Sequence, residues 1–202
     1  MKGLRAKAAL ILILGVFILP LAVAWMMYSG LIPFRIDTTR NLGYLVLPLV
    51  PIEWPAGMIV DTSTPDTDLA AHWVILFKPV LPCKSACRGY LTQLRQVHRA
   101  AGRDQQRIKL VILFEIPQDE SQLQEIRDLY PQFLLANRPG AVIFRTLETA
   151  AHNSGAQIPN PGFYLVDPLG NIMMVYPQNN GPASVSKDLK RLLTWSQLDK
   201  SS

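Results

Sequence analysis

Residues 71–101 read AHWVILFKPVLPCKSACRGYLTQLRQVHRAA, and this stretch decides the fold. Its first part, AHWVILF at 71–77, is a short apolar run with branched side chains, which is typical of a buried strand. A helical pattern follows at 85–101, with apolar residues at Leu91, Leu94, Val97 and Ala101. Cys83 and Cys87 lie where the first pattern gives way to the second. The stretch therefore predicts a buried strand that leads through a cysteine-bearing turn into a helix.

The segments downstream alternate between strand and helix patterns. Buried strands are predicted at 107–116 and 163–167, and helices at 119–135, 147–152 and after Ser184, with a short apolar run at 141–144. A turn signal at 168–171 joins FYLVD to a returning strand, IMMVY. Helical crossovers favour parallel strands early in the domain, and the tight turn favours an antiparallel pair late. This order, β-α-β and then β-β-α, is that of an α/β fold of the thioredoxin type.

The N-terminal residues 8–28, AALILILGVFILPLAVAWMMY, carry no charge. A helix of this length rises about 1.5 Å per residue and spans the roughly 30 Å hydrocarbon core of a bilayer. The basic flank at 1–7, with Lys2, Arg5 and Lys7, predicts that the N-terminus stays inside the membrane barrier and the rest lies outside. We therefore expect one N-terminal transmembrane helix ahead of the domain.

A cleaved signal peptide is the alternative for this segment, because Ala22-Val23-Ala24 resembles a small-x-small cleavage site. The apolar run continues through Trp25 and Met26, beyond the usual h-region of about 7–15 residues, which favours the anchor. Both alternatives export the domain to an oxidising compartment.

A proline-rich linker is expected at 29–69, because this segment lacks a helical period. Its prolines include Pro33, Pro48, Pro51, Pro55 and Pro65. We expect the linker to hold the domain away from the membrane and to contribute a candidate edge strand at 43–54. The thioredoxin-like domain itself is expected at 70–202.

The charge of the chain excludes one class of partner. The formal net charge is +5, and three of these charges belong to the N-terminal flank, so the rest is close to neutral. We find no basic stripe and no interleaved aromatic residues of the kind that nucleic-acid binding requires. We therefore expect no nucleic-acid partner.

The chain has two cysteines, Cys83 and Cys87, and their CxxxC spacing leaves three roles open. A helix N-terminus favours the thiolate through its dipole and free N–H groups. Two fully helical cysteines at this spacing would have Cβ atoms about 5–6 Å apart, wider than the roughly 3.8 Å of a disulfide. Two thiolates that share a metal tolerate this gap, and soft thiolates select Cu(I). If Cys83 lies in the loop, the pair can still close a disulfide, either reactive or passive.

The CxxxC pair and the downstream sequence YLVDPLG at 164–170 together resemble the Sco (SenC-type) family of membrane-anchored, thioredoxin-like copper proteins. Members of that family assist assembly of the dinuclear copper centre of cytochrome c oxidase. The resemblance covers about residues 70–195 and the anchor. It implies that Cys83 and Cys87 are the two sulfur ligands, and that oxidase subunits or assembly factors are partners. It also implies a single-pass protein of the bacterial inner membrane, with a cytoplasmic N-terminus and a periplasmic domain.

The chain departs from the Sco pattern at two positions. Arg88 stands where that pattern has a proline, and Pro159 stands where it has a third ligand, a histidine. His152 is the candidate substitute ligand, because it lies in the region before Pro159. Pro161, just ahead of a strand, resembles the cis-proline that faces the active thiols in thioredoxins.

The sequence therefore predicts a membrane-anchored assembly factor for cytochrome c oxidase that uses Cys83 and Cys87 for Cu(I) handling, thiol–disulfide exchange or both. One alternative is an exported oxidoreductase with other clients, in which Cys83 attacks a client disulfide and Cys87 resolves the mixed disulfide. The other is a thioredoxin-like scaffold with a passive disulfide. The residues alone do not decide between an enzyme and a copper chaperone, and Cu(I) is the one cofactor expected.

Overall fold

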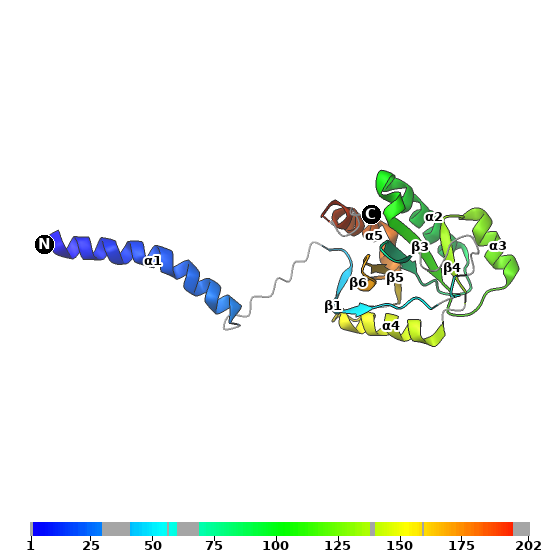
Figure 1. Ribbon diagram of the computed structural model, residues 1–202, viewed down its shortest axis with the longest axis horizontal. Coiled ribbons are helices and arrows are strands. Elements are labelled where there is room, and N and C mark those ends of the chain that lie inside the picture. The colour runs from blue at the N-terminus through cyan, green and yellow to red at the C-terminus, as the bar shows by residue number, and fades with distance from the viewer. Residues whose placement is uncertain are drawn as a thin grey trace. The chain divides into compact units, whose positions relative to one another are not determined.

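The computed structural model describes residues 2–29, 41–55, 57–59, 69–137, 140–158 and 160–195. The chain divides into two compact units, Met1–Arg40 and Asn41–Ser202 (Figure 1). The first unit contains helix α1, Lys2–Tyr28, with Pro20 in its interior. Large apolar side chains such as Leu12, Phe17 and Leu21 are exposed on it. In the part of the chain that the structure describes, no helix combines the length and the apolarity needed to cross a membrane.

The second unit is built on a six-stranded sheet in the order β1-β6-β5-β2-β3-β4. The strands are β1 Tyr44–Pro51, β2 Trp73–Phe77, β3 Ile108–Leu113, β4 Phe133–Ala136, β5 Pro161–Val166 and β6 Asn171–Pro177. The strands β2, β3 and β4 are parallel, and β2, β5, β6 and β1 pair antiparallel. The mixed sheet confirms the α/β class and the expected order of parallel and antiparallel pairs.

Helices cover both faces of this sheet. They are α2 Ser85–Ala100, α3 Glu120–Leu129, α4 Gly140–Asn153 and α5 Gly181–Trp195, with short 3₁₀ turns η2 Gly102–Arg107 and η3 Gln178–Asn180. Figure 1 shows α4 on one side of the sheet and α2 and α5 on the other. Because successive strand residues point to opposite faces, Ile75 and Phe77 pack in the α2 layer while Val74 and Leu76 pack in the α4 layer.

Two segments differ from the sequence expectation. The helix predicted at 119–135 ends at Leu129, and Phe133–Ala136 instead forms β4, which pairs in parallel with β3. Pro131 cannot donate to a helical hydrogen bond, and all four strand residues are buried, so the sheet outweighs the helical pattern here. The apolar run at 141–144 and the helical run at 147–152 belong to one helix, α4.

A buried carboxylate joins the beginning of the second unit to its last helix. Asp188 on α5 is 1% exposed, and its Oδ2 accepts hydrogen bonds from the backbone N–H groups of Leu42 (2.8 Å) and Gly43 (2.9 Å). The Tyr176 hydroxyl donates to the same oxygen at 3.1 Å. Burial first, and then the neighbouring Asp188 carboxylate, raises the pKa of Tyr176 well above its ordinary value. Tyr176 therefore stays neutral and remains a donor. Strand β1 begins directly after Gly43 and lies at the edge of the sheet. It falls within residues 43–54, where the sequence predicted a candidate edge strand.

Candidate functional site

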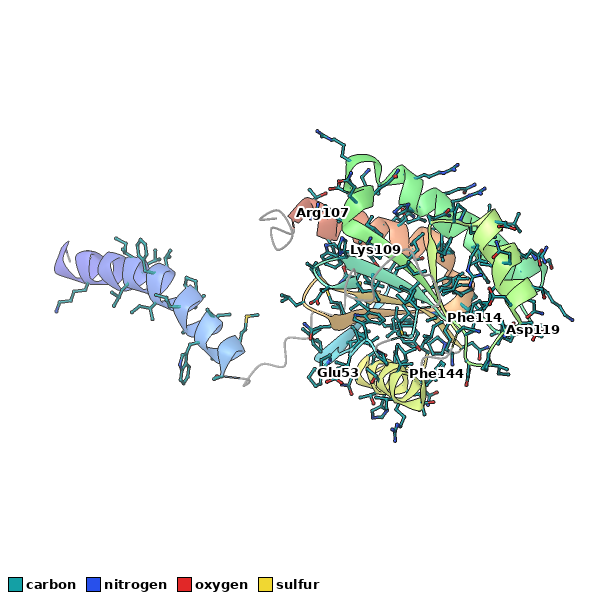
Figure 2. All side chains as sticks on the ribbon, turned by 45° about the vertical axis from the view of Figure 1, so that its right-hand side comes forward. Glu53, Arg107, Lys109, Phe114, Asp119 and Phe144 are labelled. Carbon is teal, nitrogen blue, oxygen red and sulfur yellow. A yellow bond between two sulfur atoms is a disulfide. The ribbon has the colours of Figure 1, made fainter. Side chains whose placement is uncertain are left out.

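Cys83 and Cys87 form a disulfide at the carboxyl end of β2. Figure 2 shows Phe114 and Asp119 at one end of the sheet, with Arg107 and Lys109 at the other. Since β2 runs parallel to β3, which ends just before Phe114, the disulfide lies at the Phe114 end. The two Cα atoms are 5.1 Å apart. Cys83 precedes the first residue of α2 and Cys87 lies in its first turn, so the spacing expected for two helical cysteines does not apply.

The two cysteines differ in exposure. Cys87 is 5% exposed and packs in the core beside Leu91 and Leu94. Cys83 is half-buried and lines a pocket at the surface. Cys83 is therefore the more accessible residue of the pair.

The beginning of α2 is electrostatically suited to a thiolate. Lys84 occupies the N-cap position without a side-chain capping bond, and the first turn contains no acidic residue. The free N–H groups and the positive end of the helix dipole thus lack a carboxylate partner in that turn. Arg88 adds positive charge nearby, although its Nη2 forms an ion pair with Glu125 at 2.7 Å. These features favour the thiolate form of a cysteine placed here.

Three aromatic rings hold the reactive end of α2 on the sheet. Phe77 at the end of β2 stacks on Phe163 of β5, with ring centroids 4.8 Å apart. Tyr90 of α2 meets both rings edge-on, at 6.0 Å from Phe77 and 5.7 Å from Phe163. Such pairs contribute about 0.5–1.5 kcal/mol each beyond the burial of their area. The position of the disulfide is therefore set by rigid elements rather than by the loop alone.

The pocket beside Cys83 lies between α2 and α3 and has a volume of about 110 Å³. Pro82, Leu91, Ile126 and Leu129 supply its apolar surface. The α3 side of this pocket shows only an ordinary amphipathic pattern in the sequence. No sequence signal could have found it, since the pocket depends on how α3 packs beside α2.

The motif YLVDPLG has a structural role at the opposite end of β5. Asp167 is buried, and its Oδ1 accepts hydrogen bonds from the backbone N–H groups of Leu169 (2.9 Å) and Asn171 (2.8 Å). Gly170 has φ +82°, a conformation that favours glycine, and closes the turn between β5 and β6. Val166 pairs with Val74 near the start of β2, so this turn is remote from the disulfide.

The other sequence candidates do not join the two sulfurs. His152 is exposed in the last turn of α4, which packs on the sheet face opposite α2. Within the described ranges, no group of three or more His, Cys, Asp or Glu side chains could hold a metal ion. Pro159, the position of the missing Sco histidine, lies outside the described residues. The donors offered to a metal in the described part are thus two thiolates, after the disulfide is reduced.

The expectation of a cis-proline at Pro161 is wrong. Among the described residues, the cis peptide bonds precede Pro48 and Pro82. The chain turns into β5 through Asn160 instead, whose φ of +47° lies in the left-handed region that asparagine tolerates. Pro161 lines a second surface pocket together with Val80 and Leu81, close in sequence to Cys83.

Comparisons with known proteins agree with this fold. The family model for the transmembrane-like, thioredoxin-like, C-terminal domain matches residues 73–196. Apo Sco1 from Thermus thermophilus is similar in structure, with a TM-score of 0.51 and 18% identity over 78% of this chain and 99% of that one. A SCO1/SenC family lipoprotein from Bacillus anthracis gives a TM-score of 0.50 and 15% identity over 73% and 99%. At these identities the likeness concerns the fold. A search of curated proteins found no match.

Proposed function

This chain belongs to the family of transmembrane-like, thioredoxin-like C-terminal domains, and from that premise we propose that it is a thiol–disulfide exchange protein acting through Cys83 and Cys87. One observation carries the proposal: the Cys83–Cys87 disulfide joins a half-buried cysteine that lines a surface pocket to a buried cysteine in the first turn of α2. This is the asymmetry that an attacking thiol and a resolving thiol require.

The exchange proceeds in two balanced steps. The Cys83 thiolate attacks a client disulfide, forms a Cys83–client disulfide and releases one client thiolate. The Cys87 thiolate then attacks the Cys83 sulfur, closes the Cys83–Cys87 disulfide and releases the second client thiolate. Two electrons pass from the pair to the client, and the protons lost by the two thiols are taken up by the client thiolates. The same two steps in reverse order oxidise a client dithiol.

A purely structural disulfide is the weaker alternative. The two cysteines are four residues apart in sequence, so the bridge closes a very short loop. The chain-entropy relation gives only about 2 kcal/mol of stabilisation for such a loop. Buried apolar side chains already pack around Cys87, so we expect the fold to survive reduction of this bridge.

We expect the Cys83 thiol to be alkylated at least about tenfold faster than the Cys87 thiol at pH 7, because it is reachable and lies at the helix start. Iodoacetamide labelling of Cys87→Ser, in which Cys83 is free, and of Cys83→Ser measures the two rates. The same comparison in denaturant is the control, and there the two rates should converge. Equal rates in the folded protein would favour a passive disulfide.

The client that we propose is a component of cytochrome c oxidase assembly. The CxxxC pair together with YLVDPLG resembles the Sco family, and the chain is a Sco-like protein of thioredoxin fold. A copper-centre cysteine that must be kept reduced is a suitable client for a dithiol donor. The same dithiol can also carry Cu(I) as cargo, because two thiolates suit this soft ion.

We expect the reduced full-length chain to bind one Cu(I), and the oxidised chain to bind none. Loss of either sulfur in Cys83→Ser or Cys87→Ser should weaken Cu(I) binding by at least about tenfold, since one soft ligand is removed. Anaerobic competition against a chromophoric Cu(I) chelator measures the affinity. The exposed, non-ligating Ser85→Ala variant is the matched control. Unchanged Cu(I) binding in both cysteine variants would contradict the proposed Cu(I) role, and the proposed exchange activity would still stand.

We further propose that residues 8–28 anchor the chain in a bacterial inner membrane, with the domain in the periplasm. The uncharged run and the basic flank at 1–7 support this placement. We expect alkaline phosphatase fused after Ser202 to be active, and a fluorescent reporter that folds only in the cytoplasm to be dark. A mature N-terminus at Trp25 would indicate cleavage instead of anchoring, and cytoplasmic reporter activity would contradict export.

A further inference from the structure

The pocket between α2 and α3 is the strongest candidate for a further binding site. Of the two cysteines, Cys83 lines this pocket. A group that occupies the pocket therefore lies beside the residue whose thiol makes the attack in the proposed function. A client side chain next to the client cysteine can enter the pocket while the client sulfur reacts with Cys83.

Hydrogen bonds fix two sides of the pocket. The Tyr130 hydroxyl donates to the Arg88 carbonyl oxygen at 3.2 Å and contacts Thr92 Oγ1 at 2.9 Å, which ties the end of α3 to α2. Asn137 accepts from the Gln118 N–H at 2.7 Å and donates to the Gln118 carbonyl at 3.1 Å. These bonds hold the segment before α3 on the end of β4. The pocket is thus preformed, which lowers the entropic cost of filling it.

The lining of the pocket combines apolar side chains with polar and charged ones. The Arg88–Glu125 ion pair crosses from α2 to α3 at the rim, and both side chains are about half exposed. The Gln122 side chain is also exposed at the rim, where its amide can meet a peptide backbone. Exposed ion pairs contribute little stability, so this pair can move aside for a ligand. An apolar side chain flanked by peptide backbone matches this arrangement.

The volume selects the size of the occupant. The pocket has a volume of about 110 Å³. An engineered apolar cavity that binds benzene in another protein has roughly 150 Å³. The pocket is open at the surface, and a branched aliphatic side chain matches its volume better than an aromatic ring does. We propose that this pocket receives a valine, leucine or isoleucine side chain adjacent to the client cysteine, and so selects clients with an aliphatic residue there. The inference rests on the proposed exchange function and names its substrate class.

The test uses the reduced full-length chain in detergent and a series of disulfide-linked peptide dimers, Gly-X-Cys-Gly and Gly-Cys-X-Gly. X is glycine, alanine, valine, leucine, phenylalanine or tryptophan. In each reaction the Cys83–Cys87 dithiol becomes a disulfide and two peptide thiols are released, so two electrons move per dimer. We expect leucine or valine dimers of one register to react about tenfold faster than glycine dimers, because a matched apolar pocket discriminates by this amount. Bis(2-hydroxyethyl) disulfide, which has no side chain to dock, gives the reference rate.

Variants of α3 make the assignment specific. Gln122→Trp fills the pocket and should reduce the leucine preference below about twofold, where the preference is the ratio of the leucine and glycine dimer rates measured on the same variant. Ser121→Trp, on an exposed neighbouring position outside the pocket, is the matched control and should keep the preference. Ile126→Ala enlarges the pocket and should shift the optimum towards phenylalanine.

Each outcome decides the matter. A flat rate across the peptides, a preference that survives Gln122→Trp, or an optimum unmoved by Ile126→Ala would overturn the pocket assignment while leaving the exchange function standing. Failure to reduce even bis(2-hydroxyethyl) disulfide would overturn the exchange function itself, and the pocket assignment with it.

Discussion

Replacing Asp188 by alanine should lower the free energy of unfolding of the chain by about 3–5 kcal/mol, the largest stability loss expected of a single polar residue here. The carboxylate oxygen accepts two backbone N–H groups, from Leu42 and Gly43, and the Tyr176 hydroxyl. Alanine removes the acceptor of the buried Gly43 N–H and of the partly buried Leu42 N–H, and leaves the Tyr176 hydroxyl only its weaker contact with Met174 Sδ at 3.2 Å. Each buried donor that loses its acceptor costs about 1–3 kcal/mol. Urea unfolding followed by fluorescence and circular dichroism measures the change.

Two controls separate the hydrogen bonds from other effects of the change. Asp188→Asn keeps one acceptor oxygen and should cost less, about 1–2 kcal/mol. Lys187→Ala alters an exposed neighbour on the same helix and should stay within about 0.5 kcal/mol of the wild type. A loss below about 1 kcal/mol in Asp188→Ala would show that other acceptors replace the carboxylate.

The close approach of Gly43 to Tyr176 gives the same region a second constraint. A Cβ at Gly43 would overlap the Tyr176 ring. The backbone must therefore come this near for its N–H to reach Asp188. The three elements β1, β6 and α5 thus meet at one buried polar point, and the chain enters the sheet at a fixed place.

Local patterns were sufficient for the reactive segment, because the information is contiguous there. The apolar run that ends at Phe77, the helical spacing from Leu91 onward and the two cysteines between them lie within one stretch. Their spacing alone could not decide between metal and disulfide. That choice depended on whether Cys83 joined the helix, and the structure places Cys83 ahead of it.

Tertiary context decided what the patterns could not. The stretch 133–136 has an apolar composition compatible with helix or strand, and its pairing with β3 makes it a strand. Asp188 looks like a surface residue of an amphipathic helix, yet its partners are distant in sequence and bury it. The expectation of a cis bond at Pro161 failed for a local reason, because the neighbouring Asn160 supplies the bend with its positive φ.

The motif by which the family is recognised lies away from the reactive cysteines. YLVDPLG led to the Sco resemblance, but in the structure Asp167 and Gly170 form a hairpin turn remote from the sulfurs. The motif therefore reports the fold, and the function must be argued from the cysteines. The proposed function consequently depends on the behaviour of the two sulfurs, which can be separated experimentally.

Cys83→Ser should abolish disulfide exchange, with a loss of at least about a thousandfold, because the reachable nucleophile is removed. Cys87→Ser should behave differently. Its Cys83 still attacks the client disulfide, but no resolving thiol closes the intramolecular bridge, so the Cys83–client disulfide accumulates. Cys83→Ser thus cannot attack the client disulfide, whereas Cys87→Ser attacks it but cannot resolve the mixed disulfide.

The trapped intermediate supplies the measurement. Each reduced full-length variant is mixed with bis(2-hydroxyethyl) disulfide, quenched with acid and analysed by mass spectrometry under non-reducing conditions. We expect an adduct of one 2-mercaptoethanol on Cys87→Ser, little adduct on Cys83→Ser, and the intramolecular disulfide alone on the wild type. The adduct should disappear on treatment with dithiothreitol, which distinguishes a disulfide from irreversible modification. Equal adducts on both variants would mean that the burial of Cys87 does not protect it in the reduced state. The assignment of attacking and resolving roles would then be wrong, because it rests on the difference in exposure between the two cysteines.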